Sequence, residues 1–181
     1  MKIETTEIND LLILMPDVFG DNRGYFFESF SDKKYEAFGI KDKFVQDNIS
    51  KSAKNTVRGL HLQIGAKAQG KLCQVLYGKV LDVAVDVRSG SKTFGKYFSI
   101  ELSEKNHLQL WIPKGFAHGF SVLSDEAIFF YKCTEYYDKA SERSIIFNDP
   151  KLAIDWRVDR PIISEKDLKA VTFTQFVSQN L

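Results

Sequence analysis

The middle of this chain alternates between apolar and other side chains with a period of two. The alternation runs through residues 81–87, 97–103 and 108–112, and residues 127–134 form a further apolar and aromatic run. A period of two is typical of an extended strand that buries one face. These segments therefore predict short β-strands, and we expect residues 81–87 to bury only the face that carries the leucine and valines.

Turn signals separate the predicted strands at residues 77–79, 88–91 and 113–115, where glycine, serine or proline interrupts the apolar pattern. The composition agrees, because 13% of the residues are aromatic and only 4 are proline, and aromatic side chains fit the pleated surface of a sheet. Many short strands at nearly regular spacing favour a sandwich or a barrel. We therefore predict an all-β fold, a jelly roll built from two sheets.

Only short helices at the periphery are expected. Residues 32–38 have a helical pattern that ends at Gly39, and Ser164 with Asp167 forms a capping box that opens a short C-terminal helix. A chain of 181 residues is below the length at which a single core stops growing, roughly 250–300 residues. We expect one domain over residues 1–181.

The charges nearly cancel, with 25 Lys and Arg against 24 Asp and Glu and a formal net charge of +1. This balance argues against a nucleic-acid partner held by overall positive charge. The N-terminal segment has no apolar signal core, and no apolar run approaches the roughly 18 residues of a membrane helix. We expect a cytoplasmic protein without membrane contact. Cys73 and Cys133 stand in strand-like contexts and are expected to be small buried side chains.

Two of the three histidines, His61 and His118, are flanked by glycine and apolar residues, so each could equally be a packed core side chain. The segment from Pro113 to His118 resembles the second motif of the cupin superfamily. Metal-binding cupins carry His-x-His in the first motif, whereas this chain has a single histidine followed by Leu62 and Gln63. The ligands for a catalytic divalent metal are therefore incomplete, and we expect neither a metal nor another cofactor.

A longer series of motifs is much more specific than the cupin resemblance. In chain order, the blocks occupy residues 19–28, 46–48, 58–63, 69–71, 113–120, 131–137, 142, 148–150 and 164–167. The series resembles the dTDP-4-dehydrorhamnose 3,5-epimerase family over residues 15–170. The resemblance implies a cupin-type jelly roll, a homodimer with strand exchange, and a substrate in which a nucleoside diphosphate carries a 4-keto sugar.

The chemistry of such a substrate explains the residue types in these motifs. A ketone at C4 acidifies the hydrogens at C3 and C5, because either carbanion delocalises onto the ketone oxygen as an enolate. Inverting a carbon then needs a base on one face, an acid on the other and a positive group near the enolate oxygen. No metal, nicotinamide or pyridoxal is required.

The resemblance assigns these roles to four residues. His61 is the base, Asp167 orients its ring, Tyr137 is the acid, and Lys71 stabilises the enolate. Local sequence also allows simpler roles: Asp167 as the third residue of the capping box, Tyr137 as an aromatic residue of the core or rim, and Lys71 as a solvated lysine at the start of a strand.

The resemblance also implies the substrate-binding residues. Arg23 and Arg58 are candidates for the diphosphate, since guanidinium groups match phosphate oxygens. Phe26 and Glu28 belong to a segment that reaches across the dimer toward the nucleotide. The other polar positions of the pocket are Gln46, Asn48, His118 and Glu142.

The leading hypothesis is therefore cofactor-independent epimerisation at C3 and C5 of a nucleotide-linked 4-keto-6-deoxy sugar, for surface polysaccharide synthesis. The same chemistry on a GDP-linked 4-keto heptose, inversion of one carbon only, and a ketoisomerase on the same scaffold are alternatives within the class. A non-catalytic cupin module that binds sugar is the alternative from another class. A binding module would need no opposed acid and base, so the joint presence of His61, Lys71, Tyr137 and Asp167 favours the enzyme.

Overall fold

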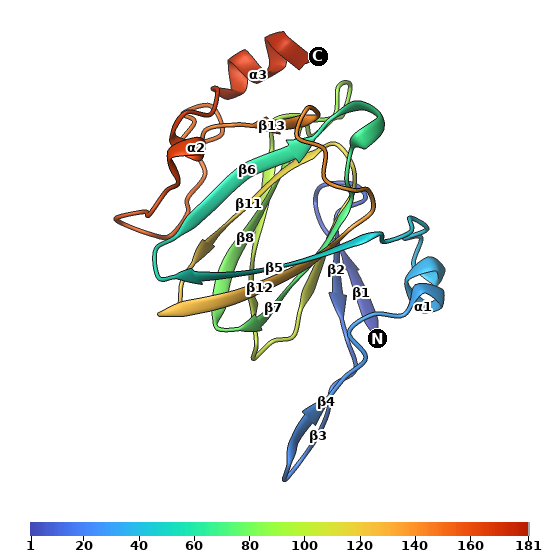
Figure 1. Cartoon of the computed structure of the whole chain (residues 1–181). Helices are drawn as coiled ribbons and strands as arrows, with labels where there is room; N and C mark the ends of the chain where they lie inside the picture. Colours follow the sequence, from blue (N-terminus) through green and yellow to red (C-terminus); the bar gives the residue numbers. More distant parts are fainter. Residues whose placement is uncertain (181) are drawn as a thin grey trace.

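Two antiparallel β-sheets packed face to face form the body of the structure, a computed structural model that describes residues 1–180 (Figure 1). The six-stranded sheet has the order β1 (Lys2–Thr5), β2 (Leu12–Met15), β10 (Gln109–Ile112), β7 (Lys71–Tyr77), β12 (Glu126–Cys133), β5 (Gln46–Ala53). The five-stranded sheet has the order β13 (Glu142–Ser144), β6 (Val57–Gln63), β11 (Phe116–Val122), β8 (Lys79–Asp86), β9 (Tyr97–Ser103). Sequence neighbours are often not neighbours in a sheet, and this double-sheet arrangement confirms the predicted all-β jelly roll.

The main core lies between the two sheets. It joins side chains of β7, β10 and β12 to side chains of β8, β9 and β11, and includes Cys73, Ala84, Leu110, Phe120 and Phe129. The strands predicted from the alternation match β8, β9, β10 and β12 to within two residues. The prediction that both cysteines are buried is also confirmed.

One prediction about β8 was wrong, because both of its faces are buried. Asp82 and Asp86, expected on an open face, are fully inaccessible to solvent. The aspartates lie on the face of β8 that looks into the main core between the sheets, as Ala84 does. The opposite face, which carries the leucine and valines, is covered by Trp156, Phe173 and Phe176 of the C-terminal segment. The two carboxylates remain in the core because each has partners there, a histidine for Asp82 and an arginine with two hydroxyls for Asp86.

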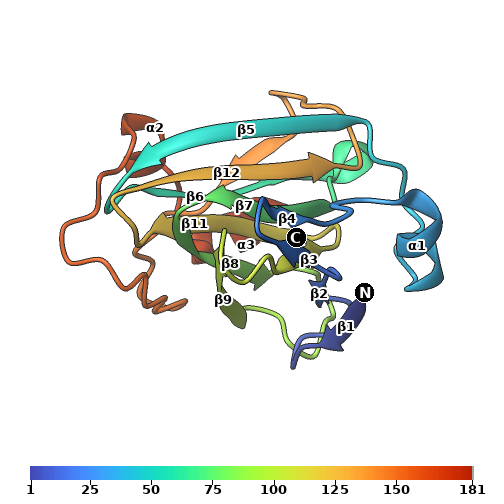
Figure 2. The same cartoon turned by 90° about the horizontal axis from the view of Figure 1, so that it is seen from below.

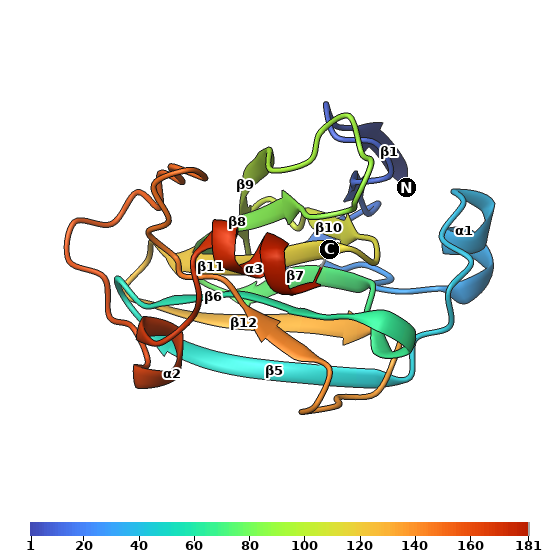
Figure 3. The same cartoon turned by 90° about the horizontal axis from the view of Figure 1, so that it is seen from above.

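The helices lie at the periphery, as predicted. The helix α1 (Asp32–Ala37) ends just before Gly39, whose φ of 89° suits glycine, and α2 (Glu165–Leu168) begins at the expected cap, Ser164. These two helices lie at opposite ends of the sandwich (Figure 2). A third helix, α3 (Phe173–Asn180), was not predicted and lies over the five-stranded sheet (Figure 3). The turn η1 (Gly65–Lys67) is a single 3₁₀ turn after β6.

A small hairpin projects away from the sandwich (Figure 1). Its strands β3 (Phe19–Asp21) and β4 (Gly24–Phe26) pair only with each other, and Phe19, Tyr25 and Phe26 are each more than half exposed. We call residues 19–26 the hairpin arm. Within residues 1–180, the helices are all too short to cross a membrane.

Candidate functional site

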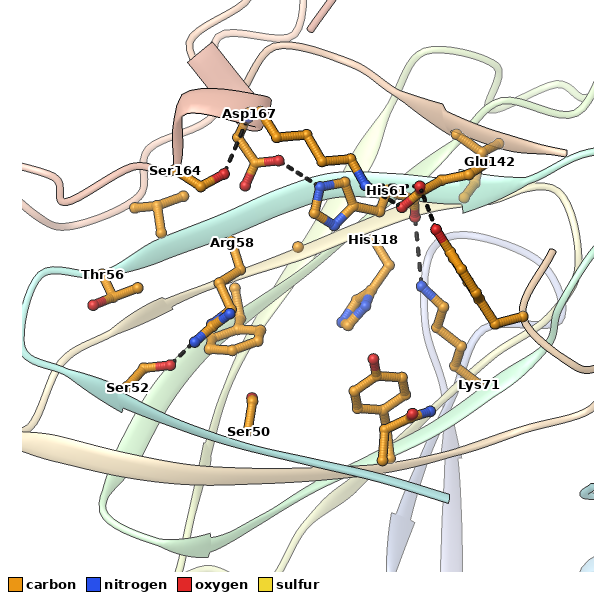
Figure 4. Close-up of a pocket in the computed structure, with 18 of the residues that line it drawn as sticks. Ser50, Ser52, Thr56, Arg58, His61, Lys71, His118, Glu142, Ser164 and Asp167 are labelled. Carbon is orange, nitrogen blue, oxygen red and sulfur yellow. Dashed lines mark hydrogen bonds and ion pairs between the residues drawn. The ribbon is translucent and has the colours of Figure 1, made fainter. Parts of the chain in front are cut away.

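A cavity of about 850 Å³ lies between the two sheets and opens to solvent, a volume typical of small-molecule sites. Side chains from β5, β7 and β12 of one sheet and from β6 and β11 of the other line it, and α2 closes one side (Figure 4). Of the site residues predicted from sequence, His61, Asp167, Tyr137, Lys71, Gln46, Asn48, Arg58, His118 and Glu142 line this cavity.

His61 and Asp167 form a close pair at the wall of the cavity. The Nε2 atom of His61 lies 2.6 Å from Oδ1 of Asp167, and the other carboxylate oxygen accepts a 3.4 Å hydrogen bond from the Gly59 amide. Since Nε2 is engaged by a carboxylate, it carries the proton, and Nδ1 retains the lone pair that faces away from Asp167 (Figure 4). Burial alone would raise the pKa of Asp167, but the hydrogen bond and charge of His61 outweigh it and the pKa is lowered.

Only half of the predicted capping box forms at Asp167. Its backbone amide donates to the Ser164 hydroxyl over 3.1 Å, but its side chain turns to His61 and not back to the Ser164 amide. The cap fixes the start of α2, and that start places the carboxylate. Asp167 therefore takes part both in the start of α2, through its backbone, and in the site, through its side chain.

A second histidine stands directly beside the first. His118 on β11 is the cross-strand partner of His61 on β6, and both side chains line the cavity. The strands can approach here because Gly59 and Gly119 have no side chains: a Cβ on Gly59 would lie 2.6 Å from the Gly119 Cα. The glycines that flank both histidines in the sequence thus serve the packing of the two strands.

His118 is buried and has its own carboxylate. Its Nε2 lies 2.5 Å from Oδ1 of Asp82, and the Cys73 sulfur lies 3.8 Å from the same nitrogen. Burial lowers the pKa of His118, although the neighbouring Asp82 charge opposes this shift. The ring is therefore a neutral imidazole whose tautomer is set by Asp82.

The facing sheet supplies Lys71 and Tyr131. The Lys71 ammonium donates to the His61 carbonyl oxygen over 3.5 Å and lies 5.9 Å from the centre of the Tyr131 ring. Tyr131 pairs with Asn48 on one side and Cys73 on the other, so its strand β12 is flanked on both sides. Burial raises the pKa of Tyr131 to about 12, which keeps the phenol protonated. Sequence reasoning gave Tyr131 no role, although its alternation with buried Phe129 and Cys133 places it on the inner face.

The rim of the cavity holds a second group of polar side chains. Tyr137 is 55% exposed, and its hydroxyl donates to Oε2 of Glu142 over 3.0 Å. Lys166 of α2 donates to both oxygens of Glu142 over 2.7 Å and 2.7 Å. Lys166 was missed from sequence, because a lysine in the first turn of a surface helix gives no local signal of a site.

The inner face of β5 is entirely polar. Gln46, Asn48, Ser50 and Ser52 follow one another at every second position and line the cavity. The guanidinium of Arg58 lies across from them, with Nε donating to the Ser52 hydroxyl over 3.0 Å. This wall therefore offers hydroxyl, amide and guanidinium groups to a polar or anionic ligand.

Three predicted substrate-binding residues lie outside the cavity of their own chain. Arg23 and Phe26 belong to the hairpin arm, where Arg23 pairs with Asp21. Glu28, just after the arm, pairs with Lys34 over 2.9 Å. Within one chain, the fold does not bring these three residues to His61.

Comparisons with known proteins agree with this geometry. A model of the dTDP-4-dehydrorhamnose 3,5-epimerase family matches residues 5–175. The dTDP-4-dehydrorhamnose 3,5-epimerase of Shigella flexneri is 53% identical over 174 residues, which is 96% of each chain. The dTDP-6-deoxy-D-glucose-3,5-epimerase of Legionella pneumophila, solved in complex with dTDP-4-keto-L-rhamnose, is 51% identical with a TM-score of 0.95, over 99% of this chain and 96% of that one.

A more distant solved structure is informative because of its substitutions. It is a 3'-monoepimerase from Streptomyces bikiniensis in complex with dTDP, with a TM-score of 0.89 and 28% identity over 95% of this chain and 87% of that one. The protein in that crystal carries a histidine-to-asparagine and a tyrosine-to-phenylalanine substitution, at positions 70 residues apart.

Proposed function

Because this chain belongs to the dTDP-4-dehydrorhamnose 3,5-epimerase family, we propose that it inverts C3 and C5 of a 4-keto-6-deoxy sugar linked to dTDP. The product is a nucleotide-linked sugar of the kind used to build surface polysaccharides, made in the cytoplasm. One observation carries the proposal. His61 lies on one sheet, Lys71 and Tyr131 lie on the facing sheet, and all three line the same cavity.

In the proposed first step, Nδ1 of His61 takes a proton from the carbon next to the ketone. The electron pair of that C–H bond moves onto the C4 oxygen as an enolate, and the ammonium of Lys71 offsets the new negative charge. Asp167 stabilises the imidazolium that forms, because its carboxylate lies 2.6 Å from the other ring nitrogen.

In the second step, a phenol on the opposite face returns a proton to the carbon, which inverts the centre. The enolate electron pair moves back to form the new C–H bond, and the ketone is restored. His61 then releases its proton to water and the phenolate regains one, which the solvent-open cavity permits. The same cycle serves C3 and C5, since both carbons adjoin the C4 ketone.

Tyr131 suits the role of acid better than Tyr137, the residue that the motif reading favoured. Tyr131 lies on the sheet facing His61, whereas Tyr137 lies on the rim with its hydroxyl already donated to Glu142. The spacing supports the same choice, because His61 and Tyr131 are 70 residues apart, as are the histidine and tyrosine replaced in the Streptomyces bikiniensis protein. We assign Tyr137 to the binding of the nucleotide at the rim.

The diphosphate is proposed to lie along the polar wall, between Arg58 and the β5 hydroxyls of Ser50 and Ser52. A guanidinium with neighbouring hydroxyls is a good match to phosphate oxygens. Although the net charge of the chain is small, Arg58 and Lys71 place two positive charges at this cavity.

The complete site is proposed to need two chains. Exposed aromatic residues on a projecting hairpin are costly in water unless another surface covers them, and Phe19, Tyr25 and Phe26 are 66%, 58% and 70% exposed. In a homodimer with exchanged arms, each arm would bring Arg23 and Phe26, with Glu28 just after it, to the nucleotide in the partner's cavity.

Proton NMR of the dTDP-linked 4-keto-6-deoxy sugar in heavy water tests the proposed function. We expect solvent deuterium at both C3 and C5 and conversion to the doubly inverted product. Deuterium at only one carbon would restrict the activity to a single inversion, as in a monoepimerase. Absence of exchange with this sugar and with a GDP-linked 4-keto heptose would contradict the epimerase assignment.

A further inference from the structure

Three potential metal ligands lie close together at the inner end of the cavity. The reaction proposed above uses none of them as acid or base. They are Cys73 on β7, Asp82 on β8 and His118 on β11, so they come from both sheets. One donor atom from each lies within 4.8 Å of the other two. Cys73 and Asp82 are 0% exposed and His118 is 6% exposed.

The carboxylate of Asp82 has an unsatisfied oxygen. Oδ1 is bonded to His118, but Oδ2 is buried and has no hydrogen-bond partner among residues 1–180. A buried carboxylate oxygen without a partner is costly, and native structures seldom retain one without a reason. An additional cation at this point would satisfy it.

We propose that Cys73, Asp82 and His118 form a binding site for a divalent transition metal of the zinc type. A thiolate sulfur, a carboxylate oxygen and an imidazole nitrogen are the ligand types that Zn²⁺ takes in proteins, at about 2.0–2.3 Å. Donor atoms that already lie within 4.8 Å of one another can close on such an ion with side-chain rotations alone.

The charge balance of the site fits a buried dication. A thiolate and a carboxylate carry two negative charges, so the occupied site is neutral and avoids the cost of burying net charge. Burial raises the pKa of the Cys73 thiol, yet a coordinated thiol loses its proton to the metal.

The site also has a route for the metal. His118 lines the cavity, whereas Cys73 and Asp82 lie behind it. An ion that enters through the cavity reaches His118 first, because the other two ligands are fully buried. Occupation would break the bond between His118 and Asp82, so we expect a bound metal to slow the epimerase. The metal site does not depend on that activity.

Titration of the untagged, metal-free protein with Co²⁺ tests the site, because cobalt bound to a thiolate absorbs strongly in the near ultraviolet. We expect one equivalent of Co²⁺ to produce this band and Zn²⁺ to displace it. Elemental analysis after dialysis against Zn²⁺ is expected to give one metal per chain.

Substitutions identify the ligands, and Cys133, the second free cysteine, provides a matched control. Cys73→Val is expected to abolish the band, whereas Cys133→Ser is expected to retain it. Asp82→Asn keeps the shape of the side chain and is expected to weaken binding. Near-ultraviolet circular dichroism is expected to show that all three variants remain folded. No thiolate band in the wild type, or a band lost with Cys133 and kept without Cys73, would overturn the proposal.

Discussion

His61 and Asp167 are 106 residues apart in the chain, yet their side chains lie 2.6 Å from each other. The histidine comes from β6, between β13 and β11 in the five-stranded sheet, and the aspartate comes from a four-residue helix near the C-terminus. Their contact leaves Nδ1 as the free basic atom in the cavity. The orientation of the proposed base therefore depends on how α2 is anchored.

Replacing Asp167 by Asn is expected to reduce kcat by about 10²–10⁴-fold, the usual contribution of general acid–base catalysis. The amide preserves the shape and the backbone cap, but it can neither stabilise the imidazolium nor fix the same tautomer. The measurement is the initial rate at saturating substrate. Ser164→Ala is the control, since it removes the cap at about 1 kcal/mol and leaves the carboxylate. A kcat for Asp167→Asn equal to that of the wild type would contradict the role of the carboxylate.

Tyr131→Phe and Tyr137→Phe distinguish the two candidate acids. We expect Tyr131→Phe to retain deuterium exchange next to the ketone while losing most of the inversion, because His61 still removes the proton and the far-face donor is missing. Tyr137→Phe is expected to raise KM more than it lowers kcat. NMR in heavy water reports exchange and inversion separately. Full inversion by Tyr131→Phe together with its loss in Tyr137→Phe would reverse the assignment.

Lys71→Gln is expected to lower kcat by about 10²–10³-fold with a smaller effect on KM, because the ammonium is most useful when charge develops on the C4 oxygen. Steady-state kinetics measures both parameters. Lys79→Gln, at a lysine on β8 away from the cavity, is the control and is expected to behave as the wild type. A large rise in KM at constant kcat would mean that Lys71 only binds the substrate.

We expect the protein to lose stability in acid because Asp86 becomes protonated. Burial would raise its pKa, but hydrogen bonds from Arg88, Ser91 and Thr93 lower it from 3.8 to about 2. The unfolded chain therefore binds this proton more readily, so the contribution of about 2 kcal/mol is present above pH 4 and is lost as the pH falls toward 2. Urea unfolding at pH 7 and pH 3 measures it. Asp86→Asn is expected to be less stable than the wild type at pH 7, by an amount that shrinks at pH 3.

The hairpin arm gives a test of the proposed dimer. Phe26→Ala is expected to raise KM for the nucleotide sugar while kcat changes little, because the substituted residue would contact the nucleotide in the partner's cavity and not the reacting carbons. Analytical ultracentrifugation is expected to show a dimer for the wild type, and deletion of residues 19–26 is expected to weaken it. A fully active monomer would contradict the exchange of arms.

Much of the fold followed from the sequence because local patterns encode it. The period of two, the glycine turns and the capping box depend only on neighbours along the chain, and they placed β8, β9, β10, β12, α1 and α2 correctly. The same rule failed for β8, since one of its faces is covered by the other sheet and the opposite face by residues 156–176, and both covers come from distant parts of the chain. The helix α3 was missed for a related reason, because packing on that sheet stabilises its short sequence.

The sequence by itself determined the strands, the two histidines with their glycines, and the family motifs, since each is a property of short segments. Only the tertiary structure decided which tyrosine faces His61 across the cavity, that Lys166 joins Glu142 at the rim, and that Cys73, Asp82 and His118 lie close together at the inner end of the cavity. Each of these relationships joins strands that are distant in the chain. Their distances are fixed by the packing of two sheets, which no local pattern contains.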